Sequence, residues 1–209
     1  PLSSGGLGTA CYGLTKGLSK KGVDITFVVP YSAEISDVDF IKLIPAGNVK
    51  IRKITSALHP YMSSQEYKKS LGKKQSPKIY GSSLFDEVYR YTLAAEKIAE
   101  EEEFDVIHCH DWMTFEAGAR AKKKKNKPLV LHVHSTELDR TGGHQVNQHV
   151  YDLERNGMHK ADKIIAVSNF TKNKIAAHYG VPSEKINVVH NAVDFSRHCH
   201  TENFEIKKT

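Results

Sequence analysis

Short apolar runs alternate with segments of helical periodicity along most of the chain. In the helical segments an apolar residue recurs every three or four positions, which gives a helix one face to bury. The intervening runs are brief and rich in Val and Ile, as in strands buried on both faces. Helices are expected at 7–21, 81–103, 112–125, 145–159 and 169–179. Strands are expected at 23–30, 40–45, 49–54, 104–109, 128–133, 163–167 and 186–189.

This alternation predicts an α/β fold, a Rossmann-like three-layer domain whose mostly parallel sheet has helices on both faces. Segments 40–45 and 49–54 are expected to form a hairpin or an edge pair. Segment 55–77 has no regular period and is expected to be a mobile, solvent-facing loop with about one helical turn. The acidic run 100–103 opposes the helix dipole, so the last turn of its helix is expected to fray.

A glycine-rich turn, Ser3-Ser4-Gly5-Gly6-Leu7-Gly8, runs into the first predicted helix. Such a turn offers backbone N–H groups and the positive end of a helix dipole to an anion, most often a phosphate. On this interpretation Gly5, Gly6 and Leu7 bind the phosphates. The same residues equally suit tight strand–helix packing, and both interpretations stay open here. Because such a loop normally follows the first strand, the numbering is expected to begin inside a domain.

Polar residues follow directly after several predicted strands. Ligands of parallel sheets bind beyond the carboxyl ends of the strands, so these residues are expected to meet Gly5 and Gly6 at one rim. Asp111 suits either a general base or the N-cap of the following helix. His134 is the better functional candidate, whereas His132 is expected to be a partly buried structural residue. The polar strand ends are His110-Asp111-Trp112, His134-Ser135-Thr136, Ser168-Asn169 and His190-Asn191, with Ser168 an expected N-cap.

Composition limits the class of protein. The 209 residues carry a net charge of +6, much of it in the lysine run 122–125. No aromatic residues or nucleic-acid motif accompany this run, so it is interpreted as a solvated helix end rather than a nucleic-acid surface. No stretch approaches the roughly 20 apolar residues of a membrane span. Cys11, Cys109 and Cys199 are odd in number and far apart, which favours a reducing, cytoplasmic location over a disulfide framework.

Two His-Cys-His triplets, 108–110 and 198–200, suggest a metal site. Alternation on a strand places His108 and His110 on one face and Cys109 on the other, so one triplet does not supply three ligands to one ion. The usual ligand spacings of structural zinc sites are absent. No metal is expected.

Five stretches occur in one order that resembles the N-terminal half of a retaining GT-B glycosyltransferase. The resemblance is strongest to glycogen and starch synthases of the archaeal kind, and it extends from Ser3 to Asp194. Two positions depart from the pattern of the synthases: Ser3 replaces a lysine, and Ala192 replaces a glycine. The five stretches are 4–9, 110–112, 132–137, 161–168 and 188–194.

The resemblance implies transfer of glucose from a nucleotide sugar, UDP-glucose or ADP-glucose, to an α-1,4-glucan acceptor. It implies that residues 1–194 form an acceptor-side domain and that 195–209 lead toward a C-terminal nucleotide-sugar domain of the same polypeptide. Because that domain is missing from this sequence, the chain alone is expected to be inactive. A related transferase with a lipid or small-sugar acceptor, or a non-catalytic carbohydrate-binding module, remains an alternative.

The resemblance also implies roles for individual residues. Gly5 and Gly6 match the loop that reaches the donor phosphates. Asp111 and His134 match residues beside the donor sugar, and Asn191 matches an active-site asparagine near the domain hinge. No cofactor is implied, and no divalent metal is required if backbone N–H groups and cations offset the charge of the leaving diphosphate.

Overall fold

The computed structural model describes residues 5–31, 48–72 and 81–192. Its helices are α1 (Gly5–Ser19), α3 (Ser64–Gly72), α4 (Leu84–Glu101), α5 (Trp112–Lys125), α6 (Glu137–Arg140), α7 (Gln148–Lys160) and α8 (Asn169–Tyr179). Its strands are β1 (Ile25–Tyr31), β2 (Val49–Thr55), β3 (Ile107–His110), β4 (Leu129–Val133), β5 (Lys163–Ala166) and β6 (Ile186–Val188). A 3₁₀ turn, Ser183–Lys185, leads into β6.

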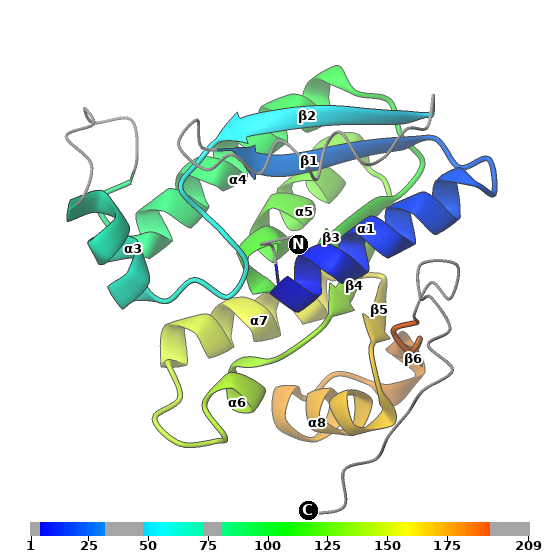
Figure 1. The fold of residues 1–209 in the computed structure, drawn as a ribbon. Coiled ribbons are helices and arrows are strands. Elements are labelled where there is room, and N and C mark those ends of the chain that lie inside the picture. The colour runs from blue at the N-terminus through cyan, green and yellow to red at the C-terminus, as the bar shows by residue number, and fades with distance from the viewer. Residues whose placement is uncertain (1–4, 32–47, 73–80, 193–209) are drawn as a thin grey trace, which may run out of the picture.

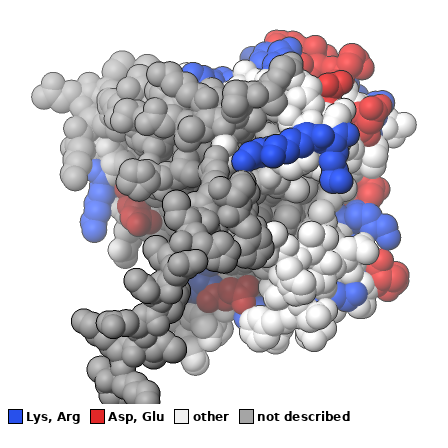
Figure 2. All heavy atoms as spheres, turned by 45° about the vertical axis from the view of Figure 1, so that its right-hand side comes forward, with Lys and Arg blue, Asp and Glu red and all other residues white. Residues whose placement is uncertain are grey.

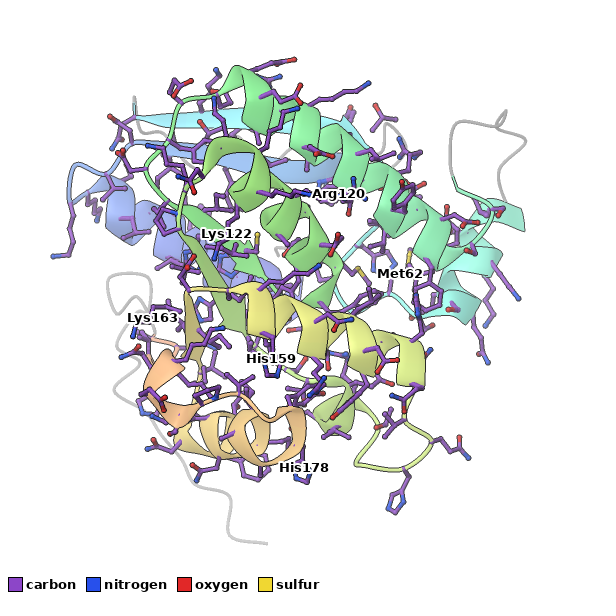
Figure 3. The ribbon with its side chains drawn as sticks, turned by 180° about the vertical axis from the view of Figure 1, so that it is seen from behind. Met62, Arg120, Lys122, His159, Lys163 and His178 are labelled. Atoms are coloured by element: carbon purple, nitrogen blue, oxygen red, sulfur yellow. The ribbon has the colours of Figure 1, made fainter. Side chains whose placement is uncertain are left out.

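All strand pairs in the described residues are parallel, which confirms the predicted α/β class. One sheet has the order β3-β4-β5-β6, and β1 pairs with β2 in a second. Helix α1 crosses in front of the strands in Figure 1, whereas α4, α5 and α7 lie behind them. Figure 3, drawn from behind, shows these three helices in front. The strands therefore form the middle of three layers.

The two faces of β3 and β4 differ in chemistry because side chains alternate along a strand. Cys109, Leu129, Leu131 and Val133 are buried on the face toward α5. A Cβ on Gly118 of α5 would lie 2.8 Å from Leu129, so this helix packs directly on the sheet. The opposite face of these two strands carries histidines, which are part of the candidate site.

Segment 55–77 is not the solvent-facing loop expected from the sequence. Ala57, Leu58 and Met62 are buried, and Figure 3 shows Met62 in the interior beside α4. The segment continues into α3, a helix of nine residues, where Tyr67 is completely buried. Its apolar residues follow no helical or strand period, so periodicity gave no sign of their burial. Residues 73–77 lie outside the described part of the chain.

Glu87 of α4 anchors this segment. Its side chain is fully buried and accepts hydrogen bonds from the Ser56 hydroxyl at 2.6 Å and the Gly81 N–H at 2.7 Å. Arg90 Nε donates to the same carboxylate at 2.9 Å. A buried carboxylate is tolerated when it is paired and hydrogen-bonded, so these bonds hold the chain between β2 and α4 in place.

The acidic end of α4 does not fray as expected. The helix runs to Glu101, and the Glu102 N–H still donates to the Ile98 carbonyl at 3.1 Å. Lys50 of β2 lies 2.7 Å from the Glu102 carboxylate, which Arg52 also contacts. Ion pairs from neighbouring elements thus offset the unfavourable dipole.

The lysine run at the end of α5 is paired in the same way. Lys124 pairs with Glu100, Lys125 with Glu103 at 2.8 Å, and Lys122 with Asp162 at 2.7 Å. Figure 2 shows cationic and acidic side chains side by side on the face it draws. The run is therefore at a helix end, as expected from the sequence, and the structure adds the ion pairs, which the sequence did not predict.

The remaining fold predictions have clear outcomes. Helices 112–125 and 169–179 have the predicted bounds, and the Ser168 side chain accepts a hydrogen bond from the Thr171 N–H at 3.0 Å as a cap. Segment 49–55 pairs with β1, whereas its proposed partner 40–45 lies outside the described residues. Within the described residues, no helix combines the length and apolarity that a bilayer crossing needs.

Candidate active site

Asp111 occupies the junction between β3 and α5. One carboxylate oxygen accepts a hydrogen bond from the His134 N–H at 2.7 Å and a longer one from the Ser135 N–H at 3.5 Å. Asp111 occupies the N-cap position of α5, as the sequence suggested, but its side chain makes no capping hydrogen bond to that helix. The backbone has φ 55° and ψ 169°, a strained conformation for a residue with a Cβ. Strain of this kind is typical of functional sites.

The Asp111 carboxylate is an unusual buried group. It is 6% exposed, and its second oxygen has no hydrogen-bond partner among the described residues. Burial raises the pKa of Asp111 to about 7, although the hydrogen bonds from His134 and Ser135 act in the opposite direction. A carboxylate that is half protonated near neutral pH suits proton exchange or charge stabilisation.

Four histidines cover the α1-facing side of β3 and β4. His110 and His132 are opposite each other in the strand register, and His108 and His134 extend the row on either side. Their rings stack at centroid distances from 4.3 Å, between His132 and His134, to 5.5 Å, between His108 and His132. His110 Nδ1 and His134 Nε2 share a hydrogen bond of 3.0 Å.

Burial keeps these rings uncharged. Burial, together with smaller contributions from neighbouring histidines, lowers the pKa of His110 to about 2, of His132 to about 3 and of His134 to about 4. Burial also lowers the pKa of His108. The expectation that His132 is buried is correct, but it belongs to a row of rings rather than to an apolar core.

Helix α1 brings the glycine-rich stretch to this side of the sheet. The Cys11 sulfur and one ring nitrogen each of His110 and His134 lie within 4.8 Å of one another. Gly5, Gly6 and Leu7 form the first turn of α1, not a turn ahead of it. Gly6 is exposed, and a Cβ there would meet no atom within 4 Å. The N–H groups of Gly5, Gly6 and Leu7 thus lie about 6–9 Å along the helix axis from Cys11.

Asn191 is the one predicted catalytic residue that stands apart from this group. It is exposed and follows β6, and the ring of the preceding residue, His190, shares a hydrogen bond of 3.1 Å with the Val167 carbonyl. Strand β5 separates β6 from β4, which puts Asn191 about 10 Å along the same edge. Asn191 makes no hydrogen bond with Asp111 or His134 in the described chain.

The segment after β4 holds a buried network that sequence reasoning missed. Thr136 and Asp139 form a capping box that starts α6. Arg140 donates to the Ser135 carbonyl at 3.1 Å and to Glu154 at 2.7 Å. Glu154, 1% exposed, also accepts from the Glu137 N–H at 2.9 Å. These bonds fix the backbone that follows His134. The sequence signal that could have revealed this network is Glu154, an acidic residue within the apolar stripe of α7.

A groove of about 510 Å³ lies between α6 and α8. Because these helices follow β4 and β5, the groove adjoins the same strand ends. Phe170 on its wall is 69% exposed, and the Lys174 ammonium lies 4.6 Å from the centre of that ring. Lys174 also pairs with Asp139. The groove is lined by Leu138, Asp139, Gly142, Gly143, Phe170, Lys174 and His178.

Comparison with known sequences identifies the family. The profile of Glycosyltransferase Family 4 matches residues 4–197. The chain belongs to this family. The match includes α1, Asp111, His134 and Asn191, so the residues singled out from the sequence all lie inside the family domain.

Two relatives show how much of the chain is similar to known proteins and at what sequence identity. The uncharacterized glycosyltransferase MJ1607 of Methanocaldococcus jannaschii is 25% identical over 202 residues, 93% of this chain and 44% of that protein. A glycogen synthase of Mycobacterium tuberculosis is 26% identical over 96 residues, 44% of this chain and 23% of that protein. This family 4 chain therefore spans less than half the length of these relatives.

The solved structures confirm the fold. Anabaena HepE, crystallised in complex with UDP-glucose, has a TM-score of 0.58 at 16% identity, covering 94% of this chain and 43% of the HepE chain. The family 4 chain thus has the Rossmann-like architecture of one half of a GT-B glycosyltransferase.

Proposed function

We propose that this chain is the N-terminal, acceptor-side half of a retaining glycosyltransferase that moves glucose from UDP-glucose or ADP-glucose to an α-1,4-glucan. The observation that carries the proposal is the bond between the Asp111 carboxylate and the His134 N–H, at strand ends where α/β proteins bind ligands. The UDP-glucose bound to HepE supports the donor class, and the likeness to a glycogen synthase supports the acceptor.

In this proposal Asp111 and His134 act on the sugar. Departure of the nucleoside diphosphate leaves positive charge on the anomeric carbon, and the His134 backbone carbonyl stabilises that charge. Asp111 acts through its hydrogen bond to the His134 N–H, which fixes the orientation of this peptide. A group that is already oriented requires no reorganisation when charge develops, which is the main advantage of such a site.

Negative charge develops at the other end of the donor, on the phosphate oxygens. The backbone N–H groups of Gly5, Gly6 and Leu7 stabilise it together with the positive end of α1. The lack of a side chain on Gly6 lets a phosphate approach the backbone closely. Asn191 contributes from the neighbouring part of the same edge. In the same proposal residues 1–194 form the acceptor-side domain, and a C-terminal domain supplies most of the nucleotide site.

The groove between α6 and α8 is the proposed acceptor site. The groove is concave and combines apolar with a few polar residues, as small-ligand sites do, and the exposed Phe170 ring offers an apolar face to a sugar. Asp139 and Lys174 at its wall offer partners for sugar hydroxyls.

The test compares two proteins, the 209-residue chain and the product of the complete gene. Each is given UDP-glucose or ADP-glucose with glycogen or maltooligosaccharides, and transferred glucose is measured. We expect transfer by the complete product with one of these donors and none by the chain alone. Transfer only to a lipid or a small sugar would contradict the glucan acceptor. Saccharide binding without transfer by the complete product would instead indicate a carbohydrate-binding module.

A further inference from the structure

The row of histidines contains ring nitrogens that no protein group satisfies. His132 Nδ1 and Nε2 and His108 Nε2 are buried and have no hydrogen-bond partner within the described residues. Leaving a buried polar atom unpaired is unfavourable, so three such atoms together indicate a missing ligand. One ring nitrogen each of His108, His110 and His132 lies within 4.8 Å of the others.

Strand pairing assembles this set, which neither His-Cys-His triplet supplies by itself. Cys109 faces α5 on the other side of the sheet, as alternation requires. The third ligand comes from the neighbouring strand, because His132 is the register partner of His110. Two histidines two positions apart on β3 and one opposite on β4 therefore project from the same face.

We propose that His108, His110 and His132 bind one divalent transition-metal ion of the zinc class. Imidazole is a favoured ligand of zinc, and three histidines with an open fourth position form the donor set of catalytic rather than structural zinc sites. A metal-binding histidine normally donates its other ring N–H to a neighbour. His110 has such a neighbour, because its Nδ1 bonds His134 Nε2 and leaves Nε2 for the metal.

The ligand nitrogens must move closer together to hold the ion. In a tetrahedral site with Zn–N bonds of about 2.0–2.1 Å, ligand nitrogens lie roughly 3.3 Å apart. The three rings are now nearly parallel, with interplanar angles of 9° to 29°. Rotation about the second side-chain torsion, which is broad for histidine, turns their nitrogens toward a common point.

A bound metal ion would cross-link β3 and β4 just before the strand ends that carry Asp111 and His134. The metal site requires only residues of this chain, so its test does not depend on whether the proposed glucosyl transfer is correct. The proposal differs from the expectation of no metal, which considered the ligands of each triplet alone and not a set drawn from two paired strands.

The test uses the purified 209-residue chain without a histidine tag. The chain is stripped with a chelator, loaded with excess Zn²⁺ alone, freed of unbound metal and analysed for its zinc-to-protein ratio. We expect one zinc per chain and a rise in the unfolding temperature. Loading with Co²⁺ gives a second readout on the unaltered chain: the visible absorption of a tetrahedral site with nitrogen ligands and no thiolate-to-metal charge-transfer band.

Three variants locate the ion. His132→Leu replaces a ring whose nitrogens have no hydrogen-bond partner within the described residues by an apolar side chain, so it should fold like the original and bind zinc more than about 100-fold more weakly. His178→Leu, at an exposed position on α8 (Figure 3), is the matched control and should bind normally. Cys11→Ser should also bind normally, since Cys11 is not in the proposed set.

Several results would overturn the proposal. These are a zinc-to-protein ratio near zero at saturating Zn²⁺, undiminished binding by His132→Leu, or equal loss in His132→Leu and His178→Leu. A thiolate band with Co²⁺, or loss of binding in Cys11→Ser, would assign the ion instead to Cys11, His110 and His134.

Discussion

The Asp111 carboxylate and the His134 backbone N–H are joined by a hydrogen bond of 2.7 Å that connects the ends of two adjacent parallel strands. The bond reaches across the sheet edge instead of capping the helix that follows Asp111. It makes the position of the His134 peptide depend on one buried carboxylate.

Removing that carboxylate should therefore destabilise the chain. Asp111→Ala leaves the His134 N–H without its acceptor, and we expect a loss of about 1–3 kcal/mol in the free energy of unfolding. Asp111→Asn keeps an acceptor oxygen and should lose less. Urea denaturation of the 209-residue chain measures both. Asp105→Ala, at a fully exposed side chain, serves as the control and should change stability by less than about 0.5 kcal/mol. Equal losses in the Ala and Asn variants would show that the hydrogen bond contributes little.

Gly6 tests the phosphate role of α1. Because a side chain at Gly6 meets no protein atom, Gly6→Val should not obstruct folding but should keep a phosphate from the backbone. We expect the donor KM of the complete gene product to rise roughly 10–100-fold, equivalent to losing one charge-assisted hydrogen bond. Gly13→Val adds the same side chain at another open, exposed position of α1 and should leave the donor KM unchanged. If both variants behave alike, Gly6 has no special part in donor binding.

Glu87 should make stability depend on pH. Burial by itself would raise the pKa of Glu87, but hydrogen bonds from Arg90, Gly81 and Ser56 outweigh it and hold the pKa below 4.5. A pKa lowered on folding stabilises the protein above the unfolded value, and that contribution is lost as pH falls through the folded value. Glu87→Gln should cost about 1–3 kcal/mol at neutral pH and flatten the loss of stability below pH ~4.5. Parallel curves for both proteins between neutral and acidic pH would contradict this prediction.

Gly157 allows α7 to pack closely on α5. A Cβ at Gly157 would lie 2.7 Å from the Phe115 Cβ, which is held by its own helix and has little room to move. Gly157→Ala should cost about 1–3 kcal/mol, as expected for overpacking. Gly17→Ala in α1 meets no neighbour and should instead be neutral or stabilise by up to about 1 kcal/mol through helix propensity. Thermal unfolding of the two variants distinguishes the cases, and a common direction of change would contradict the packing argument.

Phe170 tests the acceptor groove. Phe170→Ala removes an exposed aromatic ring, so it should weaken saccharide binding roughly tenfold with little effect on stability. Tyr89→Ala, which removes an exposed aromatic ring from α4, is the control. Acceptor KM and kcat of the complete gene product are the measurements. An acceptor KM that is unchanged in Phe170→Ala would place the acceptor elsewhere.

Periodicity in the sequence predicted much of the fold. The helices at 112–125 and 169–179 have a clear boundary signal, a polar residue before the first turn and a left-handed residue after the last. Segment 55–77 gave no such signal, because Ala57, Leu58 and Met62 are buried in an apolar cluster that also includes residues of α4, rather than through a local repeat. Burial decided by distant residues leaves no local pattern.

Only part of the candidate site could be predicted, because only some of its residues follow a pattern that is local in the sequence. Strand ends are visible in the sequence, so Asp111 and His134 were expected at one edge. The pairing of His110 with His132 depends on which strands are neighbours and on their register, which one sequence does not reveal. The ion pair between Arg140 and Glu154 likewise joins two helices whose contact only the fold defines.

Trp112, the single tryptophan of the sequence, immediately follows Asp111 and is 7% exposed, with its ring 6.1 Å from that of Phe85. Indole emission responds to the polarity and packing of its surroundings. Titrating the unlabelled chain with a nucleotide, a saccharide or a metal ion and recording fluorescence therefore reports directly on this edge of the sheet. The molecule therefore carries an optical probe of its own in the residue next to Asp111.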